Sequence, residues 1–230
     1  MEVPATVIPA HPVGEGKTAP KYPSGSWPVD TPGGRFHAEW DDQAPVTREG
    51  QLIFFFQFLH VGGRWEEFLR GCPLHYTGNR GSGARNVMGT AMLSILCGHW
   101  RYAHINAVRG DGINPGLLGM KGTVSEDAVR LGIGRIDEKP GLDWISGQIL
   151  GSIAPTLSLP WILDIDVTIK PKHYRDRADA ENCFDELKNQ WGWGGYTSRR
   201  LGSSRLMANL IALVYNWWSL YLRFYDEGHH

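Results

Sequence analysis

The sequence predicts a mainly α-helical protein that keeps one β-strand in its C-terminal third. Three observations lead to this fold class. Between residues 46 and 158, apolar residues recur at helical spacing in segments bounded by Thr, Ser, Gly or Pro. Residues 161–171, WILDIDVTIKP, are rich in β-branched side chains and bounded by prolines, as a strand would be. Residues 206–222 form a long apolar segment, which predicts a terminal helix.

Residues 1–45 predict an extended or disordered arm. They hold eight of the fourteen prolines and several glycines, a composition that disfavours regular structure. The remaining chain divides into an N-terminal helical region, residues 46–158, and a C-terminal region, residues 159–230. Apolar residues make up 42% of the 230 residues, which is enough to build a core in these two regions.

Charge and cysteine content indicate which partners and which cellular compartment to expect. The formal net charge is −1, so the overall charge favours neither an acidic nor a basic partner. Cys72, Cys97 and Cys183 form no CxxC pair, and residues 1–12 contain no apolar core of a signal peptide. We therefore expect a reduced, cytoplasmic protein.

The region 46–158 predicts a series of helices with their own boundary signals. The segments are residues 48–63, 63–72, 86–110 (a long helix and then a shorter one), 123–135 and 143–157. Ser125 or Thr123 caps the fourth segment ahead of an acidic first turn, and the fifth segment ends at Pro155 or soon after it. The glycine-rich loop at 78–85 lacks the Gly-Lys-Ser/Thr ending of a phosphate loop, which argues against a nucleotide site of that type.

The terminal apolar segment, residues 206–222, could be a membrane span or a buried helix. It is short for a span, and Asn209, Asn216 and Ser219 fall on one side of a helix. A buried core helix with a polar seam fits this pattern better than a transmembrane helix.

Two other groups of residues favour structural roles. His99 and His104 are five positions apart and not at the i,i+4 spacing of a helical zinc pair, which disfavours a metal site there. Core packing is a better interpretation than base stacking for the tryptophan pairs Trp191/Trp193 and Trp217/Trp218.

Residues 173–188, HYRDRADAENCFDELK, predict a helix whose charges are sorted onto one line. Tyr174, Arg177, Glu181 and Lys188 are separated by three, four and seven positions and therefore point in similar directions. An apolar stripe lies beside this line and contains Ala180, Phe184, Leu187 and Trp191. A solvated helix face with i,i+4 ion pairs is the simplest interpretation of such a pattern.

The spacing Tyr-(2)-Arg-(3)-Glu-(6)-Lys resembles the signature around the last catalytic acid of DDE-type insertion-sequence transposases. WILDIDVTIKP resembles the strand that carries the first catalytic Asp of this family. Residues 72–120 with SEDAVR resemble its N-terminal helical region, and residues 186–223 resemble the segment after the Glu. The resemblance covers about residues 35–230.

The resemblance implies a ribonuclease H-like α/β catalytic core that performs DNA transposition. In the family, two aspartates and one glutamate hold two Mg²⁺ ions for phosphoryl transfer on DNA ends. Asp166 matches the first Asp, with Asp164 as the alternative, and Glu181 matches the metal-binding Glu. The matches to the residues that hold the phosphates of the element ends are Tyr174, Arg177 and Lys188. From Lys170 to Arg205, eight Lys or Arg stand against five Asp or Glu, a local excess that favours DNA.

One departure from the family pattern predicts an inactive enzyme. Asp166 and Glu181 are only fifteen positions apart, so the segment that carries the second Asp is missing. Asp176 and Asp179 lie between them, but both belong to the helix of Glu181. Two carboxylates cannot clamp two metals, so we predict an internally deleted copy that does not cleave DNA.

Three alternatives remain open from the sequence. The chain could be a non-enzymatic DNA-binding remnant that interferes with intact copies, a product without function, or a helical domain unrelated to DNA. A homo-oligomer is compatible with each of them.

Overall fold

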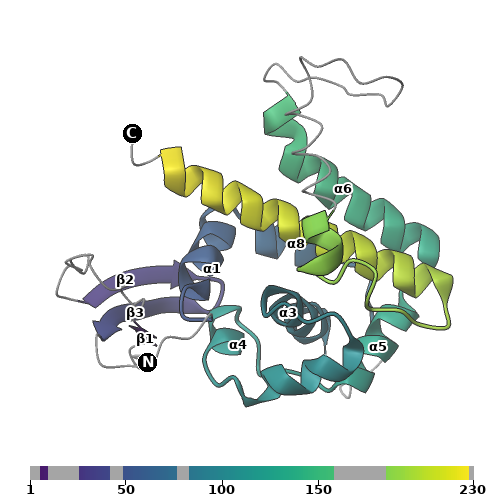
Figure 1. Ribbon diagram of the computed structural model, residues 1–230, viewed down its shortest axis with the longest axis horizontal. Coiled ribbons are helices and arrows are strands. Elements are labelled where there is room, and N and C mark those ends of the chain that lie inside the picture. The colour runs from purple at the N-terminus through teal and green to yellow at the C-terminus, as the bar shows by residue number, and fades with distance from the viewer. Residues whose placement is uncertain (1–5, 10–25, 42–48, 77–82, 158–184, 228–230) are drawn as a thin grey trace.

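The computed structural model describes residues 6–9, 26–41, 49–76, 83–157 and 185–227, most of which are helical (Figure 1). The predicted mainly helical class is therefore confirmed. The strands are β1 (Thr6–Pro9), β2 (Ser26–Thr31) and β3 (Gly34–Asp41). The helices are α1 (Leu52–Val61), α2 (Arg64–Gly71), α3 (Gly83–Leu96), the 3₁₀ helix η1 (Tyr102–Gly110), α4 (Asn114–Leu117), α5 (Glu126–Arg135), α6 (Glu138–Leu157) and α8 (Leu201–Glu227).

The helices follow the predicted segments closely. α1, α2, α3 with η1, α5 and α6 each fall within or beside the range that the periodicity indicates. The side chain of Ser125 accepts a hydrogen bond of 3.2 Å from the backbone N–H of Ala128, so Ser125 and not Thr123 is the N-cap of α5. The predicted strand at 161–171 lies outside the described residues.

Residues 26–41 form a β-hairpin where the sequence predicts an extended or disordered arm, and for these residues that prediction is wrong. β2 pairs antiparallel with β3, and β1 pairs parallel with the other edge of β3. Val29, Phe36 and Ala38 are buried on one face of the sheet, which packs on α1. Burial of alternate side chains stabilises the hairpin, although its proline content disfavours regular structure.

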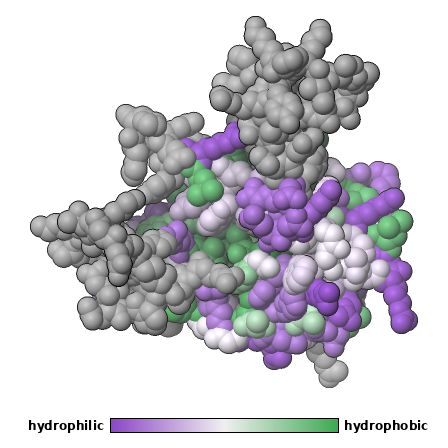
Figure 2. Space-filling model, in the orientation of Figure 1, coloured by the Kyte–Doolittle hydropathy of each residue, from purple (hydrophilic) through white to green (hydrophobic). Residues whose placement is uncertain are grey.

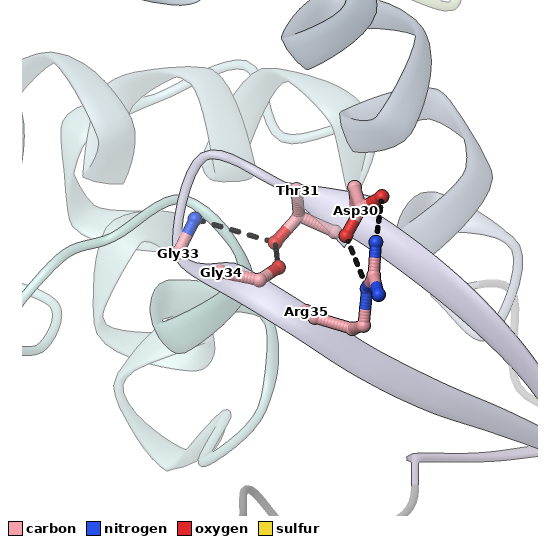
Figure 3. Close-up of polar contacts among 5 residues, drawn as sticks. All are labelled: Asp30, Thr31, Gly33, Gly34 and Arg35. Atoms are coloured by element: carbon pink, nitrogen blue, oxygen red, sulfur yellow. Dashed lines mark hydrogen bonds and ion pairs between the residues drawn. The ribbon is translucent and has the colours of Figure 1, made fainter. Parts of the chain in front are cut away.

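Polar contacts fix the turn of this hairpin (Figure 3). The Thr31 hydroxyl donates to the Gly34 carbonyl at 3.0 Å and accepts from the Gly33 N–H at 3.2 Å. Arg35 binds Asp30 in a bidentate ion pair with N–O distances of 2.8 and 2.9 Å. Pro32 lies in the turn itself, where the absence of an N–H costs no ladder hydrogen bond.

The tip of the hairpin docks on a segment far away in the sequence. The backbone N–H of Gly33 donates to the carbonyl of Leu117 at 2.8 Å. A Cβ atom at Gly33 would overlap the carbonyl oxygen of Gly116, so only glycine permits this close approach. The sheet is therefore an integral layer of the fold, joined to the helices on α1 and at α4.

The helices surround a continuous apolar core. α3 is buried from Val87 to Ile95, and α6 and α8 lie side by side across it (Figure 1). Among the largest fully buried side chains are Trp65, Phe68 and Trp217, whose rings contact one another through Phe68 at centroid distances of 5.6 Å. On the face drawn in Figure 2, hydrophilic and apolar side chains are interspersed.

The terminal helix α8 is a core helix. Leu210, Ile211 and Val214 are buried, while Asn209 and Asn216 are half-buried as the predicted polar seam requires. Within the described ranges, no helix combines the length and apolar character that a membrane crossing requires. The tryptophan pairs also pack on the core as predicted, with Trp217 buried and its partners Trp218, Trp191 and Trp193 partly buried.

Candidate nucleic-acid interface

The described residues include one of the five candidate site residues. Asp166, Glu181, Tyr174 and Arg177 all lie outside the described ranges, as does the alternative Asp164, so their roles stay predictions. Lys188 is described, and its side chain is exposed at the end of a helical segment, residues 185–189.

The helical segment that carries Lys188 is anchored on α8. Leu187 is buried, and the ring of Trp191 contacts the ring of Tyr215 edge-on at 5.5 Å. The Tyr215 hydroxyl donates to the Glu186 carboxylate at 3.1 Å. The predicted apolar stripe therefore faces the core at these two positions, and Lys188 points away from it.

Lys188 lines a cavity of about 570 Å³ that we call the basic groove. The groove lies between the start of η1 and the glycine-rich loop after residue 190. Its walls are formed by Trp100, Arg101, Tyr102, Ala103, Arg130, Lys188, Gly192, Gly194, Gly195 and Thr197. Three of these residues are cationic and none of them is acidic, so the groove attracts anions.

Glycines hold the loop of the groove against Trp100. Gly192 has a φ of 68°, a left-handed conformation that side chains other than glycine rarely adopt. A Cβ atom at Gly192 would lie 2.6 Å from Cβ of Trp100, and one at Gly195 would overlap the Trp100 carbonyl oxygen. Gly194, in contrast, faces open space. The sequence WGWGG thus encodes a close backbone contact at two of its glycines.

Two buried tyrosines pack together beside the groove, and one of them, Tyr102, also lines it. The hydroxyls of Tyr196 and Ser94 form a hydrogen bond of 2.7 Å, and Tyr196 contacts the ring of Tyr102 edge-on at 5.4 Å. The hydroxyl of Tyr102 is buried with no hydrogen-bond partner among the described residues. Burial raises the pKa of Tyr102 to about 12, although the Arg130 guanidinium opposes this shift. Burial also raises the pKa of Tyr196 well above its ordinary value.

The tyrosine pKa values predict a loss of stability at alkaline pH. Phenols titrate near pH 10 in the unfolded chain. Above this pH the unfolded state binds fewer protons than the folded state, so the free energy of unfolding falls as pH rises from about 10 towards 12. We expect the urea midpoint to fall above about pH 10, with a shallower fall in the Tyr102→Phe/Tyr196→Phe double variant. An equally steep fall in the double variant would assign the effect to other groups.

The three cations of the groove differ in their partners. Arg130 forms an ion pair with Glu126 at 3.0 Å and lies over the ring of Tyr102 at 5.2 Å. Arg101 lies over the ring of Trp100 at 5.5 Å. Among the described residues, no acidic side chain forms an ion pair with Arg101 or Lys188. Within the described part of the chain, these two charges have no ion-pair partner that would compete with a bound anion.

The described residues offer no alternative metal centre. Within residues 6–9, 26–41, 49–76, 83–157 and 185–227, three or more His, Cys, Asp or Glu side chains do not converge in a way that could hold a metal ion. The rings of His99 and His104 contact each other edge-on at 5.7 Å. Neither fact bears on Asp166 and Glu181, the predicted Mg²⁺ ligands.

Sequence reasoning did not find Trp100, Arg101 and Arg130 as members of the site. They are 58 to 88 positions away from Lys188, and no motif connects them to it. The glycine-rich loop was the available signal, because glycines at a turn can mark a close backbone approach.

Comparisons with protein-family models, curated proteins and solved structures found no match to this chain.

Proposed function

We propose that the chain is an internally deleted copy of a DDE-type transposase that binds the DNA ends of its element without cleaving them. The observation that carries this proposal is the position of Lys188. The lysine of the Tyr-Arg-Glu-Lys pattern lines the basic groove together with Arg101 and Arg130, where the local field favours a phosphate backbone.

The proposal gives the cations of the groove a physical role. DNA affinity arises mainly from Lys and Arg side chains that neutralise phosphates and release counterions. Lys188 can act as an exposed point charge, while Arg101 offers a planar guanidinium for bidentate pairing with a phosphate. On the resemblance to the family, Tyr174 and Arg177 would supply further phosphate contacts.

The proposed absence of cleavage depends on the acids of the C-terminal region. Asp166 and Glu181 would supply two carboxylates, whereas two Mg²⁺ ions in a phosphoryl-transfer site need a third acidic group from a neighbouring strand. Asp166 and Glu181 are only fifteen positions apart, which leaves no room for that strand. Binding without chemistry is therefore the activity that the residues support.

Replacement of Lys188 tests the binding surface directly. We expect Lys188→Ala to weaken binding of a duplex that carries the terminal inverted repeat of the element, and of a scrambled duplex, by the same factor. The slope of log affinity against log salt should fall in magnitude by about 1, because one phosphate contact is lost. Fluorescence anisotropy between about 50 and 200 mM salt measures both quantities.

The matched control for this test is Lys121→Ala. Lys121 is also an exposed lysine, but it does not line the groove. It should leave affinity and salt slope unchanged. Equal effects of the two variants would mean that binding depends on overall charge, and undetectable binding of either duplex by the unaltered protein would refute the proposed function.

A nicking and strand-transfer assay tests the absence of catalysis. With Mg²⁺ or Mn²⁺ and the inverted-repeat duplex, we expect no cut or joined product above the protein-free background. Product that disappears in Glu181→Ala would show an active enzyme and would contradict the proposed deletion phenotype.

A further inference from the structure

The wall of the basic groove carries an exposed aromatic ring. Seven large apolar side chains are clearly exposed in the described residues. Trp100, which is 52% exposed to solvent, is the aromatic residue among them. Its backbone and Cβ are fixed by the close approach of Gly192 and Gly195. The indole is therefore presented to solvent from a rigid base, and Arg101 lies over one side of it.

An exposed tryptophan costs free energy because its apolar surface stays hydrated. Single exposed apolar residues are common and need no explanation by themselves. Trp100 differs from the other six because, among the described lining residues, it shares its cavity with three cations and no acid. Aromatic rings that alternate with cations in a groove are the combination that stacks bases and holds phosphates of single strands.

The size of the groove distinguishes unpaired from paired DNA. A cavity of about 570 Å³ lies within the range of pockets that enclose small ligands. The bases of a duplex are stacked inside the helix, and the duplex presents only its backbone and groove edges to a protein surface. Only an unpaired nucleotide can place the face of its base on Trp100 while its phosphate reaches Arg101 or Lys188.

We infer that the basic groove binds one or two unpaired nucleotides of single-stranded DNA. The base stacks on the indole of Trp100, and the adjoining phosphates contact Arg101 and Lys188. Arg130, already paired with Glu126, contributes to the field of the groove and holds the Tyr102 side of the wall. This inference rests on the proposed DNA-binding function and adds to it a base-stacking contact that only unpaired DNA can make with the groove.

The test compares one strand with its own duplex. The probes are a fluorescein-labelled single strand of about 12 nucleotides, within the site size of single-strand binders, and the duplex formed with its complement. We expect Trp100→Ala to weaken binding of the single strand about 5- to 150-fold, the range that stacking of one base produces. Binding of the duplex should change less than about two-fold, because its phosphates still meet Arg101 and Lys188.

Two variants control for the shape of the groove and for exposure alone. Trp100→Phe keeps an aromatic face and should retain most of the single-strand affinity. Ile113→Ala removes another exposed apolar side chain, 49% accessible and outside the groove, and should change neither affinity. Urea midpoints equal to that of the unaltered protein would establish that each variant is folded.

The outcomes separate this inference from the proposed function. An equal loss for both probes in Trp100→Ala, or no loss for either, would overturn single-strand stacking. If the protein binds the duplex in a manner that Lys188→Ala weakens, but does not bind the single strand, the single-strand inference fails and the proposed DNA-binding function stands. If neither probe binds, both fail.

Discussion

Trp65→Ala lowers the free energy of unfolding by about 3–5 kcal/mol, the range for removal of a large aromatic side chain from a core. Trp65 is completely buried at the start of α2, and its ring stacks on Phe68 at 5.6 Å. Alanine leaves a cavity that the surrounding helices can fill only in part. Urea denaturation measures the loss as a lower midpoint with an unchanged slope.

The indole N–H of Trp65 adds a second contribution. It donates to the carbonyl of Leu118 at 3.2 Å, and Arg85 donates to the same oxygen at 3.0 Å. Trp65→Phe keeps a ring in the cavity but removes this hydrogen bond, so we expect a smaller loss than for alanine, with the Leu118 carbonyl still satisfied by Arg85. A loss in Trp65→Ala below about 1 kcal/mol would show that the core around α2 is looser than the structure describes.

Gly192→Ala destabilises the protein by about 2–4 kcal/mol. The left-handed conformation at φ 68° costs alanine about 1 kcal/mol, and forced overpacking against the Trp100 backbone and Cβ adds about 1–3 kcal/mol. Any relief of this contact moves the loop away from Trp100 and opens the basic groove. We therefore expect a lower urea midpoint together with weaker DNA binding in the same variant.

Gly194→Ala is the matched control, two positions further along the same loop. A Cβ atom there meets nothing within 4 Å, and its φ is not in the left-handed region. Its stability should stay within about 0.5 kcal/mol of the unaltered protein, as for surface substitutions in general. Equal losses at Gly192 and Gly194 would mean that loop flexibility, and not the contact with Trp100, controls stability.

Helices were predictable from the sequence because local signals determine them. Ser125 caps α5, the Gly62–Gly63 pair follows α1, and the apolar spacing of α8 places its buried face correctly. The sequence analysis does not predict the β-hairpin because prolines and glycines disfavour regular structure. Its signals were present: Val29 and Phe36, and beyond them Trp27 and Ala38, alternate on either side of a Thr-Pro-Gly-Gly turn.

The candidate site could be predicted only where one element carries it. Helical spacing predicts that Lys188 lies beside the apolar stripe, and the structure has Lys188 exposed next to the buried Leu187. Arg101 and Trp100, which follow α3, come close to Lys188 through two tertiary contacts. The loop of Gly192 packs against Trp100, and the hydroxyl of Tyr196 binds the hydroxyl of Ser94. Contacts of this kind join residues about a hundred positions apart, and periodicity contains no information about them.

The hydrogen bond between Gly33 and Leu117 has a consequence for biosynthesis. The turn of the hairpin leaves the ribosome 84 residues (117 minus 33) before its acceptor. At about 5–20 residues per second, the nascent hairpin waits roughly 4–17 s for that partner. During this interval the apolar face of Val29, Phe36 and Ala38 has only the later α1 helix to cover it. Slow translation between Gly33 and Leu117 would lengthen the time during which an aggregation-prone hairpin is accessible to chaperones and to neighbouring chains.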